Sequence, residues 1–138
     1  MSNRYMNQFQ LTQEKRVTAL FAKVTFGATG APTISASNSK GILSVTRNSA
    51  GTYTFVFGSG SGVSLQKDSY VKLMGAGVVM NSGASAPAAP AMYIKADNSS
   101  STSLASIQIV MNAGGTATDP ATGEIGYFQF IFGDSTAP

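Results

Sequence analysis

This 138-residue sequence predicts an all-β fold: a single-domain sandwich, jelly-roll-like, with about eight antiparallel strands. Three observations lead to that prediction. Short segments alternate apolar and polar residues, which is the period of a strand with one buried face. Clusters of Gly, Ser, Asn and Pro separate these segments at short intervals. Only 11% of the residues are charged, and just two are glutamates, which disfavours long solvent-facing helices.

The first strands are expected at 17–27 and 33–37, on either side of the turn sequence GATGAP. Segments 42–47 and 53–57 are expected to form a hairpin, because residues 48–51 (NSAG) supply turn residues. Glycines at 75 and 77 predict a bulge or corner in the next strand. The remaining strands are expected at 70–74, 78–80, 92–96, 104–111 and 125–132.

The last predicted strand is apolar on both faces. Phe128, Phe130 and Phe132 share one face, whereas Ile125, Tyr127 and Ile131 share the other. A central strand of a packed sheet has this pattern, and so does a strand covered by a partner subunit. Methionines inside the predicted strands are expected to fill the core; they are Met74, Met80, Met92 and Met111.

The composition excludes several kinds of catalytic and metal-binding site. The chain has no Cys and no His, which excludes disulfides, thiol nucleophiles, histidine triads and His or Cys metal sites. It also lacks a P-loop, a dinucleotide fingerprint and a GxSxG elbow. We therefore expect no enzyme activity, no cofactor and no resident metal. Asp119 and Glu124 share one loop and are expected to cap turns, with a weak cation site there left open.

The charge distribution and the hydropathy of the sequence limit the kinds of partner that we expect. The net charge is +3, but the basic residues lie apart, so no nucleic-acid partner is expected. Arg47, Tyr53 and Phe55 resemble a stacking platform, although the two aromatic residues fit the core better. Neither the apolar segment of a signal peptide nor a run near the ~20 residues needed to span a bilayer is present. The sequence predicts a soluble protein made in a cytoplasm, without a membrane partner.

The chain is expected to divide into an N-terminal arm, residues 1–16, and a β-sandwich domain, residues 17–138. The arm is polar and basic, with separated apolar residues. A docking arm and a solvated terminus are both compatible with that composition.

Two segments carry a resemblance: MSNRYMNQFQLTQEKRVTALFAKVTFGATGAPT at the start and NSKGILSVTRNSAGTYTFVF further on. The second contains the pattern K-G-I-x-S-V-x-R-N-x-x-G-x-Y-T-x-x-F, and the chain resembles the cement, or head-decoration, proteins of tailed phages. The resemblance implies a non-enzymatic, jelly-roll-like protein on the outer surface of the icosahedral head, made in the host cytoplasm. It implies that the protein bridges major capsid subunits as a homo-oligomer, with a dimer favoured over a trimer.

Within that interpretation, two sets of residues are expected to make contacts. The arm is expected to bind the capsid through Arg4, Tyr5, Phe9, Lys15 and Arg16. Exposed apolar residues near the ends of the sheet are expected to mediate self-association, namely Phe128, Phe130 and Phe132.

Two other functions stay open. A receptor- or glycan-binding β-module of a virion fibre or tail would need exposed aromatic residues and polar loops, for which Tyr93, Tyr127 and the loop 112–124 are candidates. A carboxylate-based enzyme would depend on Asp119 or Glu124, but their spacing gives no positive sign of it.

Overall fold

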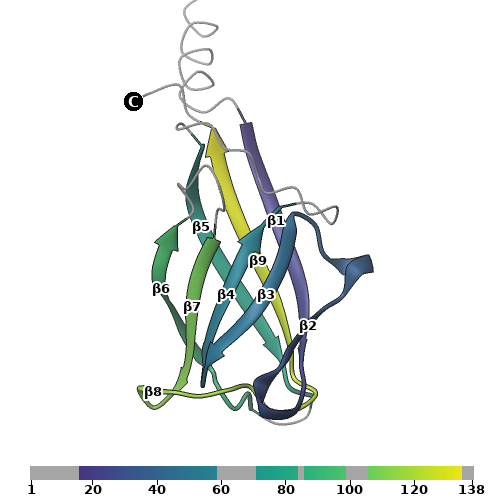
Figure 1. Cartoon of the computed structure of the whole chain (residues 1–138), viewed down its shortest axis with the longest axis vertical. Helices are drawn as coiled ribbons and strands as arrows, with labels where there is room; N and C mark the ends of the chain where they lie inside the picture. The colour runs from purple at the N-terminus through teal and green to yellow at the C-terminus, as the bar shows by residue number, and fades with distance from the viewer. Residues whose placement is uncertain (1–15, 59–70, 84–85, 99–105, 135–138) are drawn as a thin grey trace, which may run out of the picture.

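The computed structural model describes residues 16–58, 71–83, 86–98 and 106–134, and these form a β-sandwich (Figure 1). Its nine strands confirm the predicted all-β class. The strands are β1 (Arg16–Phe26), β2 (Pro32–Ile34), β3 (Ile42–Ser49), β4 (Thr52–Phe57), β5 (Val71–Asn81), β6 (Ala91–Asn98), β7 (Ser106–Ala113), β8 (Thr116–Ala117) and β9 (Ile125–Asp134). Two short 3-10 helices, η1 (Ala28–Gly30) and η2 (Ala36–Asn38), flank β2.

The strands form two antiparallel sheets. The four-stranded sheet has the order β2-β1-β9-β5, and the five-stranded sheet has the order β3-β4-β7-β6 with β8 beside β7. β1 pairs with β9 from Arg16 opposite Asp134 to Thr25 opposite Ile125. The arrangement is jelly-roll-like in that the first and last described strands pair, while the chain passes repeatedly from one sheet to the other.

Most predicted elements have the expected place. The hairpin of β3 and β4 is confirmed, and it turns at 50–51. Segments 70–74 and 78–80 belong to the single strand β5, whose register shifts between Leu73 and Gly75, so the predicted bulge is confirmed. The loop 112–124 contains the short strand β8.

The core is a ladder of aromatic rings between the sheets. β4 and β9 face each other there, and the centroids of successive rings lie 4.6 to 5.3 Å apart. Such pairs contribute about 0.5–1.5 kcal/mol each beyond the burial of their area. We call these residues the aromatic ladder; they are Phe55 and Phe57 of β4 with Phe128, Phe130 and Phe132 of β9. Tyr53 of β4 packs instead on Phe26 of β1, with 5.2 Å between the ring centroids.

The ladder overturns one prediction about self-association. Phe128, Phe130 and Phe132 are only 2%, 0% and 3% exposed, so they do not form a surface patch. β9 is an inner strand of its sheet, and its phenylalanine face is the one that meets the opposite sheet. Met74 was also wrongly assigned to the core, because it lies at the β5 bulge and is exposed. None of the described helices is long and apolar enough to cross a membrane.

Candidate functional site

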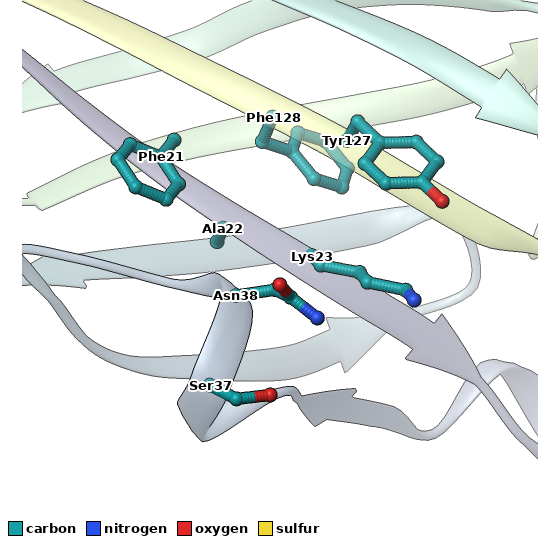
Figure 2. A pocket seen from close by; sticks show the side chains of 7 residues that line it. All are labelled: Phe21, Ala22, Lys23, Ser37, Asn38, Tyr127 and Phe128. Atoms are coloured by element: carbon teal, nitrogen blue, oxygen red, sulfur yellow. The ribbon is translucent and has the colours of Figure 1, made fainter.

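A hollow lies on the outer face of the four-stranded sheet, above β1 and β9 (Figure 2). Lys23 is directly opposite Tyr127 in the ladder of these two strands, so both side chains point to the same face. Phe21 lies two residues earlier on β1 and therefore shares that face. Ala22 and Phe128 also line the hollow, although their side chains belong to the core.

The segment 35–40 forms one wall of the hollow. It is fixed along the side of β1 that also pairs with β2, where Phe21 and Lys40 exchange backbone hydrogen bonds of 3.1 and 2.8 Å. The Ser35 amide also donates to the Lys23 carbonyl at 2.9 Å. These bonds position Ser37 and Asn38 of η2 beside the hollow, which has a volume of about 550 Å³.

The side chains of the hollow combine aromatic, cationic and amide groups. Phe21 and Tyr127 are each 44% exposed, which is unusual for such large apolar surfaces. The Lys23 ammonium lies 5.9 Å from the centroid of the Tyr127 ring, within the range of a cation–π interaction. In the view of Figure 2, Phe21 and Tyr127 lie toward opposite ends, with Lys23 and Asn38 between them.

A second surface lies between β5 and β6, the outer strands of their sheets on one side of the sandwich. Residues 76–78, residues 92–94 and Ile109 line a groove of about 300 Å³ there. We call it the β5–β6 seam. None of its lining side chains is charged, and exposed apolar residues flank it. The seam is therefore a candidate protein-contact surface.

The loop that carries Asp119 is held by a compact set of bonds. Arg47 donates to both carboxylate oxygens of Asp119, at 3.0 Å from Nε and 2.7 Å from Nη2. The Gly51 amide and the Tyr53 hydroxyl donate to Oδ1 at 2.8 and 2.9 Å. The Tyr53 hydroxyl also lies 2.9 Å from the Gly30 carbonyl oxygen, so its single proton serves two acceptors. We call this set the Asp119 clasp.

The clasp explains three residues of the pattern R-N-x-x-G-x-Y. Arg47, Gly51 and Tyr53 all bind the same carboxylate. Gly51 has φ +66°, and a Cβ there would lie 2.4 Å from the Met111 carbonyl oxygen, so only glycine fits. These three residues of the pattern therefore have a structural role, because they bind the β3–β4 hairpin to the loop 112–124.

The charges of the clasp fix its protonation. The hydrogen bond from Arg47 lowers the pKa of Asp119 to about 2, and the Gly51 and Tyr53 donors act in the same direction. Burial, followed by the neighbouring Asp119 carboxylate, raises the pKa of Tyr53 above its ordinary value. The hydrogen bond with Asp119 raises the pKa of Arg47. At neutral pH the clasp thus holds an ionised carboxylate, a guanidinium and a neutral phenol.

Glu124 has a comparable role at a neighbouring turn. It is buried, and its Oε1 and Oε2 accept hydrogen bonds from the amides of Ala88 at 2.8 Å and Ala121 at 2.7 Å. This confirms that Asp119 and Glu124 stabilise loops. No group of three or more acidic residues suited to a metal ion occurs in the described ranges.

Most of the residues that were expected to bind the capsid lie outside the described part of the chain. Arg4, Tyr5, Phe9 and Lys15 lie outside the described residues, and Arg16 begins β1 opposite Asp134.

The residues that were expected to form a glycan-binding site do not lie together in the structure. Tyr93 is on the five-stranded sheet and Tyr127 on the four-stranded sheet. In the loop 112–124, Asp119 is committed to the clasp. The second exposed aromatic residue that lines the hollow with Tyr127 is Phe21, which the sequence analysis missed. Its signal was an aromatic residue on the polar side of the first strand, beside Lys23 and Thr25.

Compared with protein-family models, curated proteins and solved structures, the chain matches none.

Proposed function

We propose that this chain is a non-enzymatic cement protein of a tailed phage. It binds the outside of the icosahedral head and bridges neighbouring major capsid subunits. The resemblance of the sequence suggests this class, and the observation that carries the proposal is the free edge of β5 beside the apolar β5–β6 seam. A cement protein needs at least one surface that binds protein, and the seam has the composition of one.

Most of the β5 edge lacks the protection that exposed strand edges usually have. As the last strand of its sheet, β5 leaves one row of backbone N–H and C=O groups without a strand partner among the described residues. Natural edges of this kind usually carry Lys, Pro, a bulge or a short strand that prevents pairing. β5 has Lys72 near its start and a register shift between Leu73 and Gly75, but residues 75–81 contain no charged residue, no proline and no bulge. This edge is suited to pairing with another strand.

The occupant that we propose is the β5 edge of a second copy. Two identical strands pair antiparallel about a two-fold axis, so each edge supplies the groups that the other needs. The two four-stranded sheets then become one continuous sheet across the dimer. Met74 and Ile94, both exposed in the single chain, flank this contact and lose water-accessible apolar area in it.

A two-fold dimer explains how cement stabilises a shell. Each dimer presents every capsid-binding group twice, so it engages two capsid subunits and the two weak contacts reinforce each other. Preferential binding to the assembled shell then stabilises that shell by mass action. The arm residues Arg4, Tyr5, Phe9, Lys15 and Arg16 remain the expected capsid contacts.

The test is co-sedimentation of the purified protein with expanded, undecorated heads of the phage that encodes it. We expect binding to saturate at a fixed number of copies per capsid subunit, and the decorated heads to withstand higher temperature. Failure to sediment with heads at micromolar protein would overturn the cement proposal.

The dimer contact has its own test in the variant Ala76→Lys. Ala76 is exposed and lines the seam, so the lysine places a charge on each copy near the two-fold axis. We expect a dimer for the unmodified chain and a monomer for the variant, measured by light scattering after size exclusion. Thr25→Lys on β1 is the matched control and should remain dimeric, because Thr25 is exposed but distant from the edge. A monomeric unmodified chain, or a dimeric Ala76→Lys variant, contradicts the contact.

A further inference from the structure

We propose that the hollow above β1 and β9 binds an acidic saccharide, a sugar that carries a carboxylate such as a uronic acid unit. This function goes beyond attachment to a capsid, and it rests on Phe21, Lys23, Tyr127 and the η2 wall. Three properties of the hollow support it: its exposed rings, its fixed hydrogen-bonding groups and its unneutralised ammonium.

The rings supply stacking surfaces. The β1–β9 register holds Phe21 and Tyr127 on an open sheet face, where each keeps 44% of its surface exposed. An aromatic ring has a negative face. The C–H groups on one side of a pyranose ring carry partial positive charge, so a sugar stacks on such a face while its hydroxyls point sideways. Half-exposed rings beside polar groups are therefore better matched to a sugar than to a purely apolar ligand.

The polar wall supplies hydrogen bonds in a fixed place. The Asn38 side chain has two N–H donors and an acceptor oxygen, and Ser37 adds a hydroxyl. Both belong to η2, whose flanks are bonded to β1 through Ser35 N–H to Lys23 C=O at 2.9 Å and Lys23 N–H to Ser39 Oγ at 3.1 Å. These bonds hold the backbone of η2 in place, so the segment itself loses little conformational entropy on binding.

The positive charge of the Lys23 ammonium favours a ligand that carries a carboxylate. Lys23 forms no salt bridge with any carboxylate of the described residues, and its described partner is the Tyr127 ring. It is also the one charged residue among the described outer-face side chains of β1 and β9. A sugar carboxylate beside Tyr127 thus meets an available positive charge, and no described acidic side chain lines the hollow to repel it.

The lining separates this hollow from the β5–β6 seam. The hollow has a volume of about 550 Å³ and combines aromatic rings with polar and charged groups. The seam has an apolar lining along two strand edges, which suits a protein. β9 lies between β1 and β5, so a β5-paired dimer leaves both of its hollows open. Two hollows on one dimer favour a polymeric saccharide through avidity.

The experiment is a titration of the ¹⁵N-labelled full chain with an oligogalacturonate, compared with a neutral galacto-oligosaccharide of the same length. We expect amide shifts centred on β1, β9 and η2 at millimolar ligand, and tighter binding of the acidic oligosaccharide by about threefold, as for an exposed ion pair. No shifts with either probe, or shifts centred on the seam, would overturn the site. Equal affinity for both probes would overturn the acidic assignment.

Three variants separate the contribution of ring stacking to binding from that of the Lys23 charge. Tyr127→Ala should weaken binding about five- to tenfold by removing a stacking face. Lys23→Gln should abolish the preference for the acidic probe while retaining binding of the neutral one. Thr46→Ala is the control, since it shortens an exposed side chain on β3, at the opposite edge of the five-stranded sheet from the β5–β6 seam, and it should change neither affinity. Circular dichroism of each variant checks that the fold is intact, and unchanged binding by folded Tyr127→Ala would contradict the proposal.

Discussion

Phe130→Ala is expected to lower the free energy of unfolding by about 3–5 kcal/mol, the range measured for large aromatic-to-alanine changes in cores. Phe130 is fully buried in the middle of the aromatic ladder. Its ring centroid lies 5.3 Å from that of Phe55 and 5.1 Å from that of Phe57. Removing the ring therefore opens a cavity between the two sheets and ends two aromatic contacts. Since small domains have about 5–15 kcal/mol of total stability, this loss is severe.

The measurement is urea denaturation followed by tyrosine fluorescence and circular dichroism. Tyr127→Ala is the matched control on the same strand, because its side chain lies on the outer face. It should cost less than about 1 kcal/mol. Similar losses for both variants would contradict the assignment of the two faces of β9. The comparison also tests the corrected view of self-association, in which the buried phenylalanines support the fold and do not contact a partner.

Asp119→Ala is expected to cost about 3 kcal/mol at neutral pH. The substitution leaves the Tyr53 hydroxyl and the Gly51 amide without their shared acceptor. Each such loss costs about 1–3 kcal/mol when the group is buried. It also ends the paired hydrogen bonds from Arg47, which join residues 72 positions apart. Asp119→Asn keeps one acceptor oxygen but removes the charge, so its loss should be smaller. Equal stability of the unmodified chain and Asp119→Ala would show that the clasp does not stabilise the fold.

The same carboxylate gives the fold a dependence on acid. Its pKa is about 2 in the folded chain and 3.8 in the reference state. A lowered folded pKa contributes stability that is complete above 3.8 and is lost as the pH falls through 3.8 toward 2. Since the carboxylate is partly exposed, solvent screening limits this contribution to about 1 kcal/mol. Urea unfolding at neutral pH and near the folded pKa measures it, and Asp119→Ala should show a smaller decrease over the same interval. An identical decrease in both proteins would assign the acid sensitivity to other groups.

The strands were predictable because alternation is a local property. β1, β4 and β7 each show their buried face in the sequence, and the β3–β4 hairpin also shows its turn. Which face of β9 is buried was not predictable. Both faces of that strand are apolar, and only the packing of β4 from the opposite sheet against one of them assigns Phe130 to the core and leaves Tyr127 on the surface.

The surfaces were less predictable, because each depends on long-range pairing. Phe21 and Tyr127 lie on one face through the β1–β9 register, which the sequence does not specify. Arg47 and Asp119 meet only after the hairpin and the loop 112–124 come together. The carboxylate loop was recognised as structural, but its basic partner was not. Arg47 was instead considered as part of a stacking platform.

The position of β9 also has a consequence for the synthesis of the chain. β9 is the last described strand and yet the inner partner of both β1 and β5. A nascent chain emerges from the ribosome in sequence order, so β1 and β5 must wait for β9 before they have their neighbour. Until then Phe55 and Phe57 of β4 lack the rings of β9 against which they pack. We therefore expect the four-stranded sheet to be completed only after β9 has left the ribosome, and the unpaired strands β1 and β5 to be the part of the nascent chain most prone to aggregation until then.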